Sequence, residues 1–401
     1  MRILVKAGKI IDGCGARPTE KGAILIDDKR VLAVGSQAEV KADARTTVLD
    51  AQDKTVIPGL MDCHAHFCSG YQIWTHEKYV AREITKSILL GITNAERCIK
   101  AGVLTVRDAG CGHLGIFEMR SAISTGQILG PRLLACGRAI AMTGGHAWDH
   151  ASEVDGPAEA RKAVRDMLRW GADCIKLMAT GGAGTQYEEI DQVQMTREEL
   201  TAAVEEAKKK KKRTFAHVGN SEGALICVEA GVDSIDHGNI LDNRALESMK
   251  KAGSFYVPTL YAYLGLATKG KEAGYADWAV EKCKRILDIH KETFQKAYKM
   301  RINIATGTDL GSEKGSYYGK LGESLITEIE LMVKYGMSPM DAIKAATRTS
   351  ARNLGIEESV GTLEKGKLAD LVIIDGNPLD NVSNLRHVWR VMKEGQIIYA
   401  A

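Results

Sequence analysis

The sequence lacks several features that would assign it to other classes of protein. Its nine cysteines show no repeated spacing and include no Cys-x-x-Cys pair, so we expect reduced thiols rather than a disulfide framework. No stretch approaches the ~18 consecutive apolar residues of a membrane-spanning helix. The first residues, MRILVKAGKIIDG, lack the uninterrupted apolar core of a signal peptide. These absences predict a cytoplasmic protein with no membrane partner.

The charge of the chain has no large excess of either sign. Its 54 basic and 51 acidic residues leave a formal net charge of +3, which provides no electrostatic footprint for nucleic acid or an anionic membrane. The single block of like charge, residues 208–213, ends a predicted helix, where basic side chains in solvent favour the helix dipole. We therefore expect a small-molecule substrate and no nucleic-acid partner.

Three familiar catalytic motifs are also missing. The sequence contains no Gly-x-Ser-x-Gly nucleophile elbow. The glycine-rich GGAGT after Lys176 lacks the Lys-Ser/Thr pair of a phosphate-binding loop, and HEKYV, which starts at His76, lacks the second histidine of a zincin helix. These absences exclude a nucleophile-elbow serine hydrolase, a phosphate-binding loop and a zincin.

Short strand-like segments occupy both ends of the sequence. Near the N-terminus they are RILVKAGKII, GAILIDD, RVLAVG and TTVLDA, and near the C-terminus LADLVIIDG, HVWRVMKEG and QIIYA. We expect the two sets to pair with each other. Residues 1–57 and 360–401 would then form a small separate β domain.

Between these ends, apolar runs of strand length alternate with longer stretches of helical periodicity. The eight runs are VIPGLMDCHAHF, VLTVRDAG, PRLLACG, CIKLMATGG, RTFAHVG, SIDHGN, FYVPTLY and INIATGTDLG. Segments such as GPAEARKAVRDMLRWGA and TREELTAAVEEAKKK are typical of the intervening helices. Eight βα repeats predict an α/β fold in which residues 58–359 form a (β/α)8 TIM barrel. An open, doubly wound sheet is the competing arrangement.

The placement of polar residues favours the barrel. Side chains able to coordinate a metal lie within or at the C-terminal ends of five apolar runs: His64, His66, Lys176, His217, His237 and Asp309. In a closed barrel these strand ends surround one opening, where active sites are built. Residues hundreds of positions apart would therefore converge.

The types of these residues suit a metal centre. His64 and His66 are two positions apart on a strand, so they point to the same side and can bind one ion together. Neutral imidazole and carboxylate are suitable ligands for zinc, iron or manganese. A bound divalent ion lowers the pKa of its water to roughly 7 and supplies hydroxide at neutral pH. Asp309 can ligate such an ion and accept a proton from its water.

In combination the motifs resemble those of the amidohydrolase superfamily. PGLMDCHAHF, CIKLMATGG, FAHVGN, IDHGN and GTDLG are similar to its metal-binding set, and TVIPG with VGTLEKGKLADLVIIDGNP is similar to its paired β-sandwich segments. The resemblance implies a distorted barrel, a small β-sandwich domain and two divalent metal ions, with zinc the first choice. It assigns one ion to His64, His66 and Asp309, the other to His217 and His237, and a bridging carbamate to Lys176.

Within the superfamily, the chain most resembles the branch of prolidase-like and arginine or lysine carboxypeptidase-like enzymes, which is related to imidazolonepropionases. TVRDAG, AMTGGHAW and IKLMATGG carry this likeness, which implies that His146 lies over the site and helps to bind substrate. One departure is clear. Many dipeptidase-like members have a tyrosine two residues after the fifth-strand histidine, whereas here His217 is followed at that place by Gly219.

The resulting prediction is a hydrolase that cleaves an amide-type C–N bond, with a dipeptide or N-acyl amino acid as the leading substrate. A hydroxide between two ions attacks the carbonyl, while Asp309 accepts its proton and delivers it to the leaving nitrogen. His146 binds the substrate carboxylate or the developing oxyanion. Because Gly219 stands in place of the tyrosine, a cyclic amide, a urea or a carbamate remains an alternative substrate. A deaminase or imidazolonepropionase-like enzyme with one metal is a rival prediction, and a non-catalytic scaffold is a remote one.

Two further expectations concern the surroundings of the site. Substrate specificity is expected from loops around Trp74, His146, Tyr187, Tyr261 and Tyr317, whereas His76, His113 and His150 are expected to face solvent. The resemblance also implies a homo-oligomer.

Overall fold

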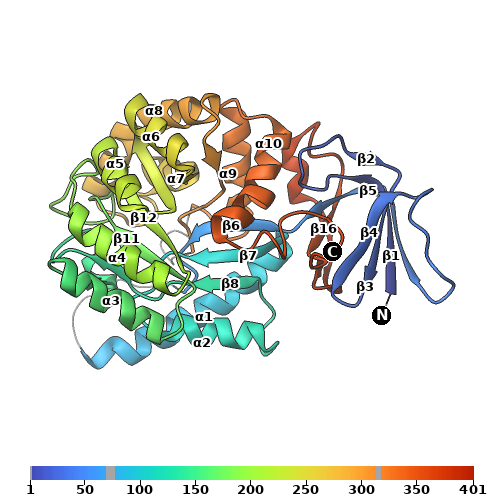
Figure 1. The fold of residues 1–401 in the computed structure, drawn as a ribbon, viewed down its shortest axis with the longest axis horizontal. Coiled ribbons are helices and arrows are strands. Elements are labelled where there is room, and N and C mark those ends of the chain that lie inside the picture. Colours follow the sequence, from blue (N-terminus) through green and yellow to red (C-terminus); the bar gives the residue numbers. More distant parts are fainter. Residues whose placement is uncertain (1, 69–76, 312–317) are drawn as a thin grey trace.

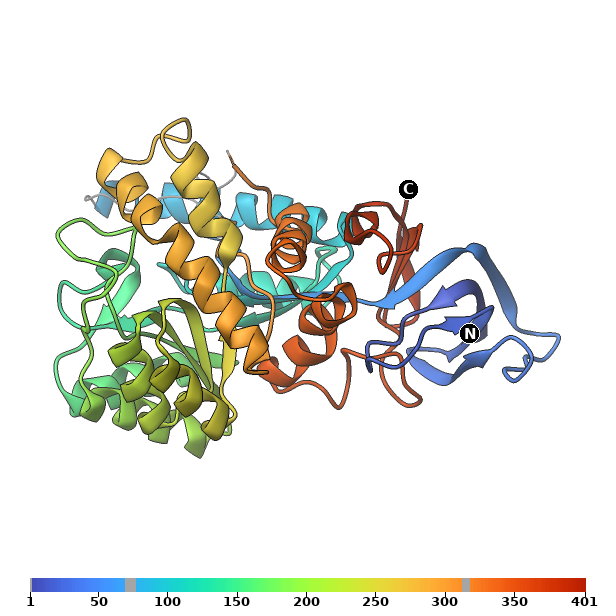
Figure 2. The ribbon, with the colours of Figure 1, turned by 90° about the horizontal axis from the view of Figure 1, so that it is seen from above.

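The computed structural model describes residues 2–68, 77–311 and 318–401. Figure 1 shows a β-sheet formed by both ends of the chain beside a larger body in which helices surround strands. Figure 2 shows the same two parts from above, with both chain termini at the terminal sheet.

The terminal sheet joins the first and last segments of the chain. Its eight strands are β1 (Arg2–Ile10), β2 (Thr19–Glu20), β3 (Gly22–Asp27), β4 (Arg30–Ser36), β5 (Thr47–Pro58), β16 (Leu371–Asp375), β17 (Val388–Lys393) and β18 (Gln396–Ala400). The order is β18-β17-β16-β5-β1-β3-β4, and β2 pairs with β1. β5 connects the two ends, because it is parallel to β1 and antiparallel to β16. Ile3, Val5 and Ile373 belong to a hydrophobic core distinct from the core of the larger body.

The larger body contains two parallel sheets. One is formed by β6 (Leu60–Ala65), β7 (Val103–Asp108) and β8 (Arg132–Ala135). The other has the order β10 (Ala151–Glu153), β9 (Ala139–Ala141), β11 (Cys174–Met178), β12 (Arg213–Asn220), β13 (Ser234–Ile240), β14 (Phe255–Val257) and β15 (Asn303–Ile304). Each predicted apolar run contains a strand, so the α/β class with parallel strands is confirmed. β9 and β10 are not predicted, because three-residue strands are too short to show periodicity.

Hydrogen bonds also connect these two sheets. On one side, Ala65 and Leu310 form a parallel bridge, and the N–H of Thr308 donates to the carbonyl of His64 at 3.0 Å. On the other side, the N–H of Asp173 donates to the carbonyl of Ala135 at 2.9 Å. The end of β6 therefore lies beside the segment that follows β15, although the two are far apart in the sequence.

Helices cover the outside of the strands in Figure 1. They are α1 (Glu77–Lys100), α2 (Gly115–Ser124), α3 (Pro157–Arg169), α4 (Arg197–Lys209), α5 (Ser221–Ala230), α6 (Asn243–Ala252), α7 (Leu260–Lys269), α8 (Asp277–Lys299), α9 (Glu323–Lys334), α10 (Pro339–Lys344) and α11 (Ser350–Leu354). The local sequence explains where two of these helices begin. α3 starts at a proline, and α4 starts with a capping box in which Thr196 and Glu199 satisfy each other's backbone N–H.

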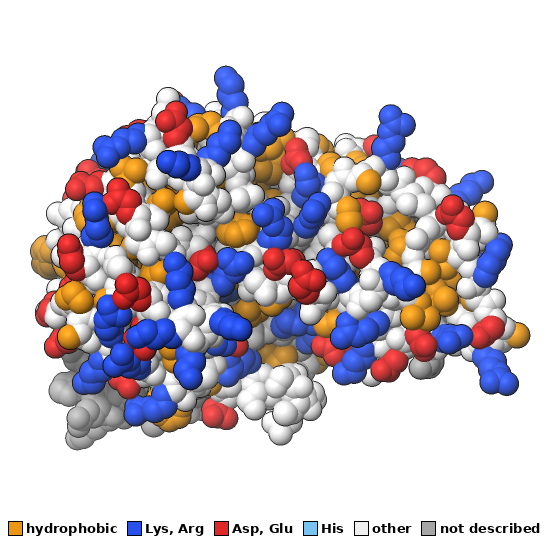
Figure 3. Space-filling view, viewed as in Figure 1, with side chains coloured by type: hydrophobic (Ala, Val, Ile, Leu, Met, Phe, Trp, Pro, Cys, Tyr) orange, Lys and Arg blue, Asp and Glu red, His pale blue; other side chains and the backbone are white. Residues whose placement is uncertain are grey.

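The surface bears mixed charges. On the face drawn in Figure 3, lysine and arginine side chains alternate with aspartate and glutamate. None of the helices in the described part of the chain is long and apolar enough to span a bilayer.

Candidate functional site

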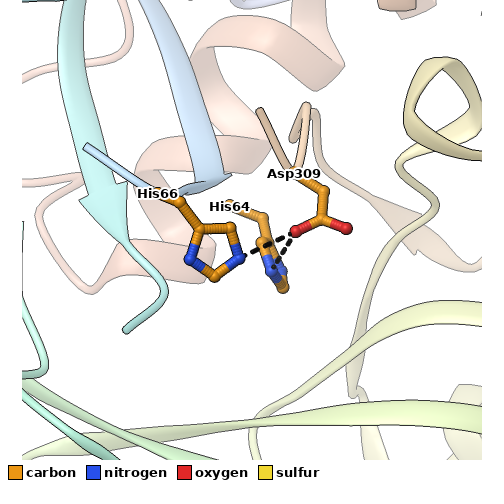
Figure 4. A group of neighbouring side chains, drawn as sticks. All are labelled: His64, His66 and Asp309. Atoms are coloured by element: carbon orange, nitrogen blue, oxygen red, sulfur yellow. Dashed lines mark hydrogen bonds and ion pairs between the residues drawn. The ribbon is translucent and has the colours of Figure 1, made fainter. Parts of the chain in front are cut away.

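Three of the predicted ligands meet at the junction between β6 and the segment after β15. Nε2 of His66 lies 3.0 Å and Nε2 of His64 lies 3.2 Å from Oδ1 of Asp309. Figure 4 shows the two imidazoles converging on that oxygen. Burial opposes ionisation of Asp309, but the neighbouring histidines outweigh it and hold its pKa well below the usual range. Two nitrogen donors and one anionic oxygen donor are therefore gathered at one point.

The other two predicted histidines lie directly beside this group. The ring of His237, on β13, is 4.7 Å from that of His64 and 4.4 Å from that of His217, on β12. Burial lowers the pKa of both His217 and His237 well below the ordinary histidine value. Both imidazoles are consequently neutral at physiological pH, which is the form that binds metals.

Each of these two buried histidines has one ring nitrogen engaged by the protein. Nε2 of His217 donates to the carbonyl of Gly181 at 3.0 Å, and Nδ1 of His237 lies 2.8 Å from the hydroxyl of Thr259. The second nitrogen of each ring has no hydrogen-bond partner among the described residues. A metal-binding histidine is ordinarily held in this way, with one nitrogen oriented by the protein and the other available.

Lys176, on β11, is buried with only 1% of its surface exposed, and its Nζ has no hydrogen-bond partner among the described residues. Burial lowers the pKa of this amine to about 8. Its Nζ lies 5.1 Å from the centre of the Phe215 ring, and the same ring lies 6.3 Å from the ring of His64. A buried amine without a partner is costly, and conversion to a carbamate with a bound cation would remove that cost.

The donor set therefore fits a site for divalent metal. Four imidazoles, one ionised carboxylate and one unpartnered amine lie on or after five of the parallel strands, and none of these donors is a thiolate. Nitrogen and oxygen donors of this kind suit zinc, manganese or iron.

A buried ion pair behind the site orients His64. Nδ1 of His64 donates to Oδ2 of Asp236 at 2.7 Å, and Nη2 of Arg107 donates to the same oxygen at 3.0 Å. Arg107 also donates from Nε to the carbonyl of Cys63 at 2.5 Å. The sequence analysis missed both residues, although Arg107 lies in the motif TVRDAG and Asp236 lies in the motif SIDHGN. The adjacency of Asp236 to His237 is the one signal that the sequence offers.

His146 lies against His217 and has a carboxylate partner that the sequence did not predict. Its ring stacks on that of His217 with centroids 4.1 Å apart, and its Nδ1 lies 2.5 Å from Oε1 of Glu188. Glu188 is buried and also accepts hydrogen bonds from the N–H of Gly182 and the amide of Gln194. Burial raises the pKa of Glu188, but the hydrogen bond and charge of His146, together with the bonds from Gln194 and Gly182, outweigh burial and lower the pKa overall.

The glycine at position 219 has a steric explanation. A Cβ at Gly219 would stand 2.0 Å from the carbonyl oxygen of Ile190, which belongs to the long loop between β11 and α4. The N–H of Gly219 donates to the hydroxyl of Thr180 at the start of the same loop. The loop thus occupies the space that a larger side chain would need.

The remaining predicted residues have varied positions. His113 is buried against Ser87 and Cys111, so its predicted solvent position is wrong, because hydrogen bonding inside the protein satisfies the ring. His150 is partly exposed, yet its Nδ1 is buried without a partner in the described part of the chain. Tyr187 is 95% exposed, and the hydroxyl of Tyr261 donates to the carbonyl of Tyr318. Trp74, His76 and Tyr317 lie outside the described residues.

Comparison with known proteins decides the family. The model of the amidohydrolase family matches residues 55–398. The chain belongs to the amidohydrolase family. It is a hydrolytic enzyme that acts on C–N bonds of a small-molecule substrate.

Several relatives cover nearly the whole of this amidohydrolase. Ochratoxinase from Aspergillus niger is 31% identical over 426 aligned positions, which cover 96% of this chain and 85% of that protein. The crystal structure of a Xaa-Pro dipeptidase with bound methionine in its active site has a TM-score of 0.89 and 33% identity, and each chain is covered completely. Imidazolonepropionase from Maricaulis maris is 25% identical, covering 91% of this chain and 89% of the relative.

Proposed function

We propose that this amidohydrolase binds two divalent metal ions, zinc first among them, and cleaves the amide bond of a dipeptide or an N-acyl amino acid. One ion would be held by His64, His66 and Asp309, the other by His217 and His237, with Lys176 bridging them as a carbamate. The observation that carries the proposal is the buried amine of Lys176, which has no hydrogen-bond partner among the described residues. Its strand lies beside the strand of His217.

The bound ions would supply an activated water and polarise the scissile carbonyl. Asp309 is the residue suited to move the proton. Its low pKa keeps it ionised, so it can accept a proton from the attacking water and deliver it to the leaving nitrogen. His146, whose Nδ1 is occupied by Glu188, directs its other nitrogen to the substrate carboxylate or to the oxyanion that forms during attack.

Two observations bear on the substrate class, and they favour different kinds of amide substrate. The relative described as a Xaa-Pro dipeptidase favours a dipeptide. The packing of Ile190 against Gly219 leaves no room for the tyrosine that many dipeptidase-like members have. Because that tyrosine is absent, a standard dipeptide is less favoured and an N-acyl amino acid is more favoured. Cyclic amides, ureas and carbamates are less favoured alternative substrates.

An imidazolonepropionase-like or deaminase activity with a single metal is the second candidate, because imidazolonepropionase is among the relatives. Lys176 speaks against it, since one ion needs no bridging ligand. The non-catalytic scaffold that the sequence left as a remote prediction is wrong, because the chain is a hydrolytic enzyme of the amidohydrolase family.

The proposal includes the architecture around the site. The strands of the eight predicted runs, β6, β7, β8 and β11 to β15, would close into a distorted TIM barrel, a closure supported by the bonds that join the two parallel sheets. Residues 1–57 and 360–401 would form the β-sandwich domain, and the chain would assemble into a homo-oligomer.

Metal analysis combined with a substrate screen tests the proposal. Purified protein is expected to contain close to two ions per chain and to hydrolyse members of a panel of dipeptides and N-acyl amino acids. Asp309→Asn is expected to keep most of the metal and to lose about 10³-fold in kcat. One ion per chain with full activity would favour the single-metal candidate, and full activity of the variant would refute the role of Asp309.

A further inference from the structure

The hydroxyl of Thr259 is diverted from its ordinary role at a helix end. Thr259 is the N-cap residue of α7, and its side chain makes no cap hydrogen bond. A threonine at this position usually accepts a hydrogen bond from the first turn of its helix. Here the hydroxyl lies 2.8 Å from Nδ1 of His237. The first N–H groups of α7 therefore need an acceptor from elsewhere.

The acceptor comes from another helix. Glu328, on α9, is fully buried, and its Oε1 and Oε2 accept hydrogen bonds from the N–H groups of Leu260 at 2.9 Å and Tyr261 at 2.7 Å. No cation lies within ion-pair distance of this carboxyl in the part of the chain that the structure describes. Burial raises its pKa to about 8, and the two backbone donors oppose the rise. A carboxyl group buried without a cation is expensive, so its retention calls for a reason.

The backbone at this point is strained. Thr259 has φ 49° and ψ 45°, in the left-handed region, which is uncommon for a β-branched residue. His237 also has a positive φ, of 71°. Such conformations persist only where surrounding contacts fix them. Because the two N–H groups that donate to Glu328 belong to the residues directly after Thr259, these bonds hold the chain where the strained turn ends.

We propose that Glu328 is a positioning residue for His237. By capping α7 from outside, it holds Thr259 in the left-handed conformation that aims the hydroxyl at the imidazole. The hydroxyl in turn fixes the orientation and tautomer of the ring that binds one of the two ions. The inference rests on the proposed function, in which His237 serves one ion and the group at His64 and His66 serves the other.

The test compares two carboxylates on the same helix. Glu328→Gln replaces one acceptor oxygen with an amide that repels a backbone N–H, whereas Glu330→Gln changes a residue whose carboxylate pairs with Arg386 at 2.6 Å. Stepwise zinc binding is measured in the presence of a competing chelator. We expect Glu328→Gln to lower the affinity for one of the two zinc ions by about 10- to 100-fold and to leave the affinity for the other unchanged. Glu330→Gln should leave both affinities unchanged.

A second variant separates positioning from a general loss of stability. Thr259→Val removes the hydroxyl and keeps the branched shape of the side chain. It should therefore lower the affinity for the same zinc ion with little change in thermal stability. If Glu328 acts through Thr259, the double variant will lose no more affinity than the Thr259→Val variant alone. Wild-type affinities in Glu328→Gln accompanied only by a lower Tm, or additive losses in the double variant, would overturn the proposal.

The ring of His237 provides a readout that does not depend on two ions. Nitrogen NMR of the metal-free protein should find one tautomer of His237 in the wild type and in Glu330→Gln, and a mixture in Glu328→Gln and Thr259→Val. Fewer than two ions in the wild type would contradict the proposed function alone. An unchanged tautomer in both site variants would overturn the role of Glu328.

Discussion

Oδ2 of Asp236 lies 2.7 Å from Nδ1 of His64, and the same oxygen accepts a hydrogen bond from Arg107. One buried carboxylate therefore links a candidate metal ligand to a buried cation. Such a partner fixes the histidine tautomer and raises the basicity of the nitrogen that faces the metal.

Asp236→Asn tests this link. The amide oxygen can still accept a hydrogen bond, but the charge that balances Arg107 is lost. We expect metal affinity to fall by about 10- to 100-fold and the free energy of unfolding to fall by roughly 3 kcal/mol. Chelator competition and urea denaturation measure the two effects. Wild-type metal affinity in the folded variant would show that Asp236 does not support His64.

The proposed carbamylation of Lys176 would make assembly of the site depend on pH. Only the unprotonated amine reacts with carbon dioxide, and burial lowers its pKa from 10.5 to about 8. The unprotonated fraction at pH 7.5 is therefore about a quarter, against roughly one in a thousand for an ordinary lysine. Reactivation of metal-stripped protein, at constant dissolved carbon dioxide, should rise with pH and level off above about 8. A rate that continues to rise toward pH 10, or one that is independent of carbon dioxide, would contradict carbamylation.

Glu188 is expected to matter for catalysis but not for metal binding. Glu188→Gln removes the charge that faces His146 at 2.5 Å, so the imidazole loses its orientation. We expect kcat to fall by roughly 10²-fold with the metal content unchanged. The adjacent Glu189→Gln is the matched control, because Glu189 is exposed and pairs with Arg285 at the surface. Equal activity of the two variants would show that Glu188 does not orient His146 for catalysis.

The packing of the β11–α4 loop on Gly219 predicts a steric penalty. A methyl group at Gly219 would stand 2.0 Å from the carbonyl oxygen of Ile190, whereas one at Gly184, in the same loop, would meet its nearest atom at 3.8 Å. Gly219→Ala should lower the free energy of unfolding by about 1–3 kcal/mol, and Gly184→Ala should change it little. Chemical denaturation of both variants decides the matter. Equal stability of the two variants would mean that the loop moves away from the added methyl group at no cost in free energy.

The strand pattern and the clustering of candidate ligands could be predicted from the sequence. Apolar runs with a polar residue at the end place His217 and His237 on neighbouring parallel strands, and the i, i+2 spacing of His64 and His66 places both on one side. These relationships follow from local periodicity and from the common direction of parallel strands.

The supporting residues could not be predicted in the same way. Arg107 and Asp236 are 129 positions apart, and Glu328 contacts the chain 67 and 68 positions away. Nothing local distinguishes a buried carboxylate from an exposed one on an amphipathic helix. Their roles appear only when the backbone donors and rings that they meet are known. The burial of His113 escapes prediction for the same reason, because the partners that satisfy its ring come from the fold.

Anomalous diffraction at the zinc absorption edge, from crystals of the zinc-loaded protein, is the sharpest test of a two-metal centre. We expect two peaks per chain, one among His64, His66 and Asp309 and one beside His217 and His237, with density for a carbamate on Lys176 between them. A single peak, or a bare Lys176 amine that contacts neither ion, would contradict the proposed centre.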